Sequence, residues 1–247
     1  FADTAPVFTP GDNFNTVLYT GNNSTQSITG VGFQPDFTWI KARDNGSNNH
    51  ALTDSVRGTG SGNGLSSNTT GAEGQYSAAY GYLSAFGTDG FTVQAGSTSP
   101  NFVNSSSANY VAWNWKAGGA AVSNTDGTVT SQVSANVDAG FSIVKWIGDG
   151  NASARVGHGI SKPDMIITKS LTDINDWNVN HVGIPNEIIY LQSTNAAFSG
   201  GGTNGAFGYQ STNTSTTFGF TGGSSSVNNV NKLNSNYIAY CFHSVAG

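Results

Sequence analysis

Large and small side chains alternate along several short segments of this chain, a period of two that is typical of β-strands. Two segments show it best, Tyr110–Trp115 and Tyr237–Phe242. In each segment the larger apolar residues share one face: Val111, Trp113, Trp115, Ile238, Tyr240 and Phe242. The other face carries Ala112 and Asn114 in the first segment, and Ala239 and Cys241 in the second. We expect strands with one face in a core and the other against a close neighbour or solvent.

These two segments belong to an internal repeat. Three pairs of similar segments recur at offsets of 126, 128 and 127 residues: Asn15–Asn22 with Phe141–Gly148, Gly32–Lys41 with Gly159–Lys169, and Tyr110–Trp115 with Tyr237–Phe242. A nearly constant offset indicates two copies of one unit. The predicted organisation is an N-terminal arm over 1–14, a first repeat over 15–118, a connector over 119–139 and a second repeat over 140–247. Within the connector, Thr128–Val137 is itself a candidate strand.

The residue types favour the same fold class. Val and Ile together number 30 against 7 Leu, while Glu, Met and Lys number only 2, 1 and 6. Residues branched at Cβ suit a pleated sheet, whereas straight side chains suit a helix. Asp-Gly and Asn-Gly pairs supply tight turns between the segments. The sequence therefore predicts an all-β protein, with two related antiparallel jelly-roll or β-sandwich units or one large sandwich built from both repeats.

Charged residues are scarce in this chain, which limits the kinds of molecule that it can bind. Only 9% of the residues are charged, and Gly, Asn, Ser and Thr make up nearly half of the 247 residues. A net charge of −5 with 9 Lys and Arg residues argues against nucleic-acid binding. No apolar run is long enough for membrane insertion. The single cysteine, Cys241, excludes an internal disulfide and a cysteine-based zinc site. Because the chain begins at Phe1 without Met, we expect it to be trimmed or a fragment.

Groups suited to catalysis are few. The four histidines show no metal-binding spacing, and the two Glu residues lie at unrelated points of the repeats. We therefore expect no enzyme and no cofactor. Two Asp/Asn clusters, Asp149–Asn151 and Asp173–Asp176, could offer oxygen ligands to Ca²⁺, although turn formation explains them equally well.

One aromatic residue, Trp177, is flanked by polar residues in the sequence. Asp176, Trp177 and Asn178, with His181 nearby, form a candidate glycan contact, since an exposed Trp can stack on a sugar while polar groups bond its hydroxyls. The alternative is packing of Trp177, which shares one strand face with Val179.

Several motifs together resemble a known repeat. In the second copy they are Phe141–Ile143, Gly157–Gly159, Pro163–Ile167, Asp176–Trp177 and Tyr237–Phe242; in the first they are Gly32–Asp36, Asp54–Gly58, Asp89–Phe91 and Tyr110–Gly118. Residues 15–247 resemble a duplicated repeat of structural proteins of tailed bacteriophages, notably marine phages. The resemblance implies a concanavalin A-like jelly-roll sandwich in tail, tail-fibre or other virion surface proteins. It implies no catalytic or binding residues.

We therefore expect a non-enzymatic virion surface protein, located outside the cell, that serves in tail-fibre or tail-associated adhesion to a host surface glycan. Capsid decoration or cement is one alternative. A carbohydrate-active depolymerase, with two Asp carboxylates across a groove, is another. The expected partners are other virion proteins, copies of the chain itself and host cell-surface polysaccharide.

Overall fold

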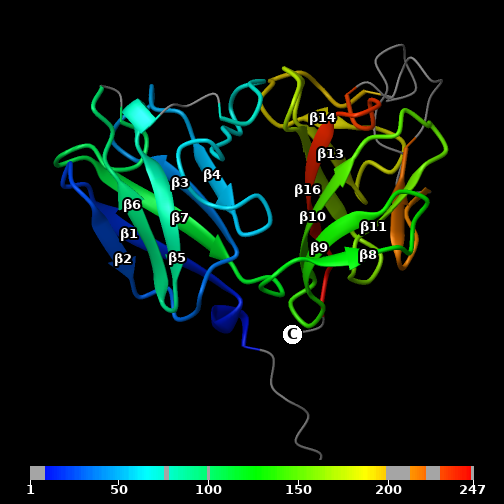
Figure 1. The fold of residues 1–247 in the computed structure, drawn as a ribbon, viewed down its shortest axis with the longest axis horizontal. Coiled ribbons are helices and arrows are strands. Elements are labelled where there is room, and N and C mark those ends of the chain that lie inside the picture. The colour runs from blue at the N-terminus through cyan, green and yellow to red at the C-terminus, as the bar shows by residue number, and fades with distance from the viewer. Residues whose placement is uncertain (1–8, 75–77, 99–100, 199–211, 221–228, 246–247) are drawn as a thin grey trace, which may run out of the picture.

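The computed structural model describes residues 9–74, 78–98, 101–198, 212–220 and 229–245, and nearly all regular structure in them is β. Two short 3₁₀ turns, η1 (Pro10–Asp12) and η2 (Ala78–Tyr80), accompany the strands. Neither has the length or apolar character of a membrane-crossing helix. The predicted all-β class is confirmed, and the chain forms two halves that lie side by side (Figure 1).

The first half is a sandwich of two antiparallel sheets. Its strands are β1 (Phe14–Thr20), β2 (Gln26–Thr29), β3 (Phe37–Ala42), β4 (Ala51–Asp54), β5 (Tyr82–Gly87), β6 (Gly90–Gln94) and β7 (Asn109–Trp115). One sheet has the order β1-β7-β3-β4 and the other β2-β6-β5. Apolar side chains from both sheets, including Val17, Ile40, Phe91 and Tyr110, fill the space between them.

The second half contains a larger sheet. Its strands are β8 (Val122–Asn124), β9 (Ser131–Asn136), β10 (Phe141–Ile147), β11 (Arg155–Gly157), β12 (Met165–Ser170), β13 (Asn178–His181), β14 (Ile189–Tyr190), β15 (Thr217–Gly219) and β16 (Asn236–Phe242). Seven of them have the order β14-β13-β12-β16-β10-β9-β8, and β11 pairs with β15. The sequence β10-β16-β12-β13 repeats the order β1-β7-β3-β4 of the first half.

The predicted arm and connector carry regular structure. Phe14, at the end of the arm range, begins β1, η1 precedes it, and residues 1–8 lie outside the described part. In the connector range 119–139, β8 and β9 extend the large sheet of the second half beyond β10. A strand within Thr128–Val137 was expected, and β9 occupies Ser131–Asn136. The connector therefore belongs to the sheet of the second half.

A third apolar cluster lies between the two halves. It contains Phe37 and Leu52 from the first half and Ile143, Ile238 and Tyr240 from the second. The larger residues of β16 therefore face the other half. The core of each sandwich receives instead the opposite faces of β7 and β16, with Tyr110, Ala112, Tyr237, Ala239 and Cys241. Both faces of β16 are buried, which explains its nearly continuous apolar sequence.

The repeated Pro-Asp motif has one role in both halves. The Asp36 N–H donates to the Trp115 carbonyl at 2.9 Å, and the Asp36 carboxylate accepts the Ala117 N–H at 2.8 Å. The Asp164 N–H donates likewise to Phe242 at 2.8 Å, and its carboxylate accepts the Ser244 N–H at 2.7 Å. Each Asp therefore ties the start of one central strand to the end of its neighbour.

The buried position of Cys241 gives a direct test of the core. Its side chain is fully buried in β16, and burial raises the pKa of the thiol to about 12. Because thiolate is the reactive form, we predict that iodoacetamide leaves native protein unmodified in mildly alkaline buffer. The thiol should react once urea unfolds the chain, as mass spectrometry would show. A Leu233→Cys variant, with 61% exposure at this position, is the positive control. Complete labelling of Cys241 in native protein would contradict the packing.

Candidate functional site

Trp177 occupies a position that excludes the predicted sugar contact. Its side chain is 0% exposed and belongs to the cluster between the halves, together with Val179. The indole N–H donates to the carbonyls of Ser66 at 2.9 Å and Thr69 at 3.1 Å, both in the first half. The prediction of an exposed Trp177 is therefore wrong, and the alternative of packing on a shared face with Val179 is confirmed.

The other three predicted contacts do not form one surface. Asn178 is fully buried on the opposite face of β13, and Asp176 accepts a hydrogen bond from the Gln192 amide at 2.6 Å. His181 is exposed and its Nδ1 accepts the Gly183 N–H at 2.9 Å. Because adjacent strand residues point to opposite faces, Trp177 and Asn178 cannot contact one ligand. The polar neighbours of Trp177 bond within the fold.

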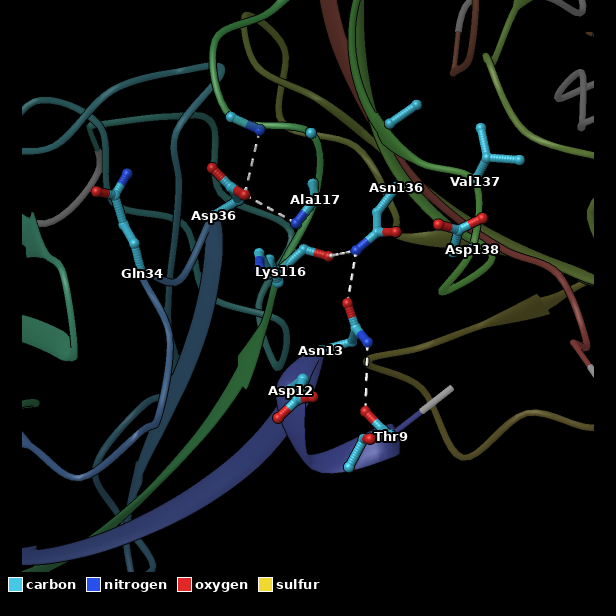
Figure 2. A pocket seen from close by; sticks show the side chains of 13 residues that line it. Thr9, Asp12, Asn13, Gln34, Asp36, Lys116, Ala117, Asn136, Val137 and Asp138 are labelled. Carbon is cyan, nitrogen blue, oxygen red and sulfur yellow. Dashed lines mark hydrogen bonds between the residues drawn. The ribbon is translucent and has the colours of Figure 1, made fainter. Parts of the chain in front are cut away.

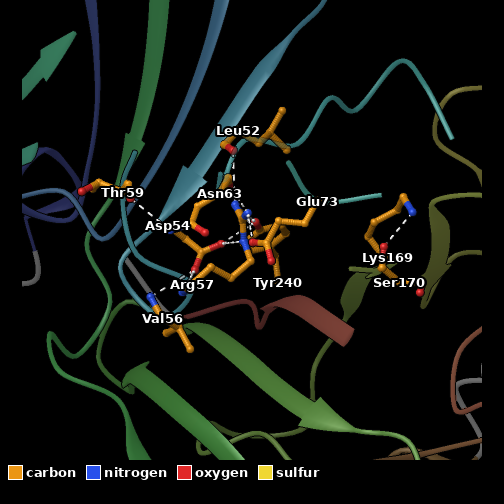
Figure 3. A network of polar contacts seen from close by, with 10 residues as sticks. All are labelled: Leu52, Asp54, Val56, Arg57, Thr59, Asn63, Glu73, Lys169, Ser170 and Tyr240. Atoms are coloured by element: carbon orange, nitrogen blue, oxygen red, sulfur yellow. Dashed lines mark hydrogen bonds and ion pairs between the residues drawn. The ribbon is translucent and has the colours of Figure 1, made fainter. Parts of the chain in front are cut away.

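A buried ionic network lies where the halves meet (Figure 3). Arg57 Nε donates to the Asp54 carboxylate at 2.5 Å, and its Nη1 donates to Glu73 at 2.9 Å. Arg57 also bonds the carbonyls of Leu52 and Asn63. From the second half, the Tyr240 hydroxyl donates to Asp54 at 2.8 Å. The charges of Arg57 and Asp54 and the hydroxyl of Tyr240 are thus held away from water, while Glu73 is partly exposed.

The protonation states of Arg57 and Tyr240 in this network are fixed. Burial by itself lowers the pKa of Arg57, but Asp54, Tyr240 and Glu73 reverse this and hold it above its ordinary value. Burial, followed by the neighbouring Asp54 carboxylate, raises the pKa of Tyr240 well above its usual range. Arg57 therefore stays a cation and Tyr240 a neutral donor. The side chains of Arg57 and Asp54 are 0% exposed, so this network serves as a link between the halves and offers no surface to a reactant.

The accessible candidate site is a polar groove of about 860 Å³ (Figure 2). Four segments that are distant in sequence line it: Thr9–Asn13 at η1, Gln34–Asp36 before β3, Lys116–Gly119 after β7, and Ala135–Asp138 at the end of β9. The groove therefore lies where the first half joins the large sheet of the second. We refer to it as the polar groove.

Hydrogen bonds hold the wall of the polar groove in place. The Asn136 amide donates to the Asn13 side-chain oxygen at 2.8 Å and to the Lys116 carbonyl at 3.2 Å. The Asn13 amide donates in turn to the Thr9 carbonyl at 3.4 Å. Figure 2 shows these amides in one chain of hydrogen bonds from Lys116 to Thr9. Residues from three separate segments are thereby fixed relative to one another.

The exposed side chains of the polar groove determine what it can bind. Asp12, Gln34, Lys116 and Asp138 are exposed around its lining. They offer carboxylate and amide acceptors together with ammonium and amide donors. The lining residues that the structure describes include no aromatic ring. Such a surface suits a ligand with many hydroxyl groups, bound by hydrogen bonds rather than by stacking.

The positions proposed for calcium are engaged in hydrogen bonds. Asp149 accepts the Asn231 amide at 2.7 Å and the Asn151 N–H at 2.9 Å. Asp173 forms an ion pair with Lys232 at 2.6 Å and accepts the Ser235 hydroxyl at 2.6 Å. Within the described ranges, no group of three or more His, Cys, Asp or Glu residues could hold a metal ion. The Asp149 carboxylate thus holds a local turn and a distant segment, and the Asp173 carboxylate holds the segment at Lys232–Ser235.

Two histidines are held neutral by their surroundings. His50 accepts the Trp39 indole N–H on Nδ1 at 2.7 Å, and burial lowers its pKa to about 4. His158 is fully buried, accepts the Ile160 N–H on Nδ1 at 3.3 Å, and has its other nitrogen 3.4 Å from the Thr214 carbonyl. Burial lowers the pKa of His158 to about 4 as well. Protonation of His158 would turn an accepting nitrogen into a donor that faces the Ile160 N–H.

The ionic network yields a stability prediction. Asp54→Ala leaves the buried Arg57 with Glu73 as its remaining acidic partner. We therefore expect the free energy of unfolding to fall by about 3–5 kcal/mol. Tyr240→Phe removes one donor to Asp54 and should cost about 1–2 kcal/mol. Urea denaturation measures both. Tyr82→Phe, at a partly exposed position of β5, is the matched control and should have little effect. Equal stability of wild type and Tyr240→Phe would contradict a tie through the hydroxyl.

His158 yields a pH prediction. Its pKa lies at about 4 in the folded chain against an ordinary value of 6.5, so between these values the unfolded chain binds the proton that the folded chain rejects. The free energy of unfolding should therefore fall as the pH falls through this window, by up to about 3 kcal/mol from this group. Urea midpoints at several pH values test it. His158→Gln should show a shallower dependence, and an unchanged slope would refute the assignment.

Comparison with known proteins places the chain in a family. Its sequence matches the family described as "Domain of unknown function (DUF7483)" over residues 9–247, a match that runs through both halves and the polar groove. No curated protein and no solved structure matches the chain. Because the match covers nearly the whole sequence, the chain belongs to the DUF7483 family.

Proposed function

We propose that this chain is a non-enzymatic surface protein of a tailed-phage virion, and that it attaches to a host surface polysaccharide through the polar groove. The observation that carries the proposal is the lining of the groove, where exposed carboxylate, amide and ammonium groups surround a volume of about 860 Å³. Polysaccharides present the hydroxyl groups that such donors and acceptors bind.

The rigidity of the groove supports a binding role. Asn136, Asn13 and the Asp36 carboxylate are held by bonds to backbone groups or to each other. A wall ordered before the ligand arrives reduces the entropy lost on binding. Strand ends from both halves supply this wall, so the groove depends on their association.

Carboxylates outside the polar groove form hydrogen bonds within the fold, which supports a role without catalysis. Asp89 accepts the Gly30 and Gly32 N–H groups at 3.0 and 2.6 Å, and Asp44 accepts the Asn109 N–H at 2.8 Å. These bonds to backbone lower the pKa of both groups, which keeps them ionised. Together with Asp54 and Asp164, they hold turns and strand ends in place. These four carboxylates therefore serve the fold.

Two sequence features support a virion surface. Motifs in both halves resemble a repeat of phage structural proteins, as described above. The chain also has only 9 Lys and Arg residues, and Arg57 and Lys169 among them are buried, which leaves few sites for trypsin-like proteases. Both features suit a durable protein exposed outside the cell.

A binding experiment tests the proposal. A glycan array of bacterial surface polysaccharides should reveal a ligand, whose Kd calorimetry then measures. Lys116→Ala and Asp138→Ala each remove exposed groups of the groove, and each should weaken binding about tenfold, equivalent to about 1.4 kcal/mol. Lys162→Ala removes an exposed lysine outside the groove lining and is the matched control.

Three results would overturn the proposal. Failure to bind any polysaccharide on the array at high protein concentration would contradict the proposed role in adhesion. Release of reducing ends from a bound polysaccharide, abolished by Asp138→Asn, would instead reveal a depolymerase. Immunogold labelling that fails to find the chain on intact particles would remove its placement on the virion.

A further inference from the structure

Among the described residues, strand β1 ends the four-stranded sheet of the first half and pairs on one side only, with β7. The Lys116 N–H donates to the Asn13 carbonyl and the Gly21 N–H to the Ala108 carbonyl, both at 2.8 Å. Because bonding alternates along an antiparallel pair, odd-numbered residues of β1 bond to β7 and even-numbered residues direct their backbone groups outward. Phe14, Thr16, Leu18 and Thr20 therefore form an open edge.

The backbone groups of this edge are satisfied only in part. The Thr16 N–H bonds the neighbouring Asn15 side chain at 2.8 Å, and the Gln26 amide donates to the Thr20 carbonyl at 3.2 Å. Both bonds are exposed to solvent. Within the described part of the chain, the N–H and C=O groups of Leu18 have no partner, and its side chain is 62% exposed. The middle of β1 is therefore ready to accept another strand.

The second half shows how the fold closes the equivalent edge. Strand β10 stands 127 residues after β1 and likewise pairs with the strand that follows it in the sheet order, β16. Its other side is occupied by β9, antiparallel, from the pair Phe141–Asn136 to the pair Trp146–Ser131. The pairing of β9 with β10 shows that an antiparallel strand fits beside this strand of the fold, of which β1 is the equivalent in the first half.

Other sheet edges of the described structure carry protection that β1 lacks. Strand β4 exchanges two backbone hydrogen bonds with Leu65, at 2.9 and 3.2 Å, and β5 has a bulge between Leu83 and Ala85. Strands β2 and β8 have four and three residues. Strand β1 has seven residues and contains no charge, proline or bulge. Exposed edges of this kind usually carry such protection, because they otherwise pair with other chains.

We propose that β1 is an interface at which two copies of this chain associate, each adding its β1 antiparallel to that of the other. The even-numbered residues of the two copies exchange N–H···O bonds and join the two four-stranded sheets into one. A two-fold arrangement brings the same surface of both copies together, so it requires a self-complementary surface. The uncharged Phe14, Thr16, Leu18 and Thr20 meet this condition, because no like charges face each other.

The position of β1 permits this association. In Figure 1, β1 and β2 lie at the side of the first half that is remote from the second half. The polar groove is lined at η1 and at strand ends and includes no residue of β1. Association through β1 therefore leaves the proposed glycan site accessible, and two copies would present two such sites.

Mass measurement with a matched pair of variants tests the interface. Light scattering during size-exclusion chromatography should give twice the mass of one chain for the wild type. Leu18→Lys places a charge at the centre of the pair, where it would face its own copy, and should give the mass of one chain. Leu233→Lys alters a leucine with the same exposure, 61% against 62%, and should remain a dimer. Circular dichroism checks that both variants fold.

A second variant and a second measurement separate strand pairing from other contacts. Leu18→Pro removes only an outward N–H, so the ladder with β7 persists while association is lost. Hydrogen exchange should show the Leu18 amide protected in the dimer and exchanging rapidly in Leu18→Lys. A wild-type monomer at all concentrations, a dimer that survives Leu18→Lys, or a dimer with an unprotected Leu18 amide would each overturn the proposal.

Discussion

The rings of Phe37 and Tyr240 stack between the two halves with their centroids 4.1 Å apart, and the arrangement of the rest depends on this contact. Around it, Trp115, Phe141 and Phe242 form a continuous aromatic layer. The Tyr240 hydroxyl reaches the Asp54–Arg57 pair at the border of the same layer. Apolar packing thus supplies the attraction between the halves, and the buried ion pair fixes their relative position because a displaced hydroxyl would leave Asp54 short of a donor.

The polar groove is a consequence of the same association. Its walls come from η1, from the ends of β3 and β7, and from the end of β9, which belong to different halves. The Asn136 amide of β9 bonds the Asn13 side chain, so the groove wall crosses from one half to the other. A change in the angle between the sheets would separate these groups. The geometry of the groove is thereby coupled to the packing of Phe37 and Tyr240, although neither residue lines it.

Sequence patterns were sufficient for the all-β class and for the strands β7, β9 and β16, because these depend on residue types and on local alternation. The patterns did not show which side of Tyr237–Phe242 packs in the core of the second half and which packs against the first half, since both sides are apolar and both are buried. Trp177 misled for a physical reason: its polar neighbours are bonded by Gln192 and by the chain itself, which sequence proximity does not show. The groove was not predicted, because its four segments meet only in the folded chain.

Trp115 and Phe242 stand 127 residues apart at the same position of the two halves, and their rings lie in contact, 6.3 Å between centroids. In a symmetric homodimer, equivalent residues meet in this way beside the two-fold axis. The layer between the halves therefore has the form of a homodimer interface held within one chain. Residues 119–139 convert an association that would depend on protein concentration into an intramolecular one with a high effective concentration. Because one chain holds both halves, the two sides of this layer need not be identical, and the buried Asp54–Arg57 pair lies on one side only.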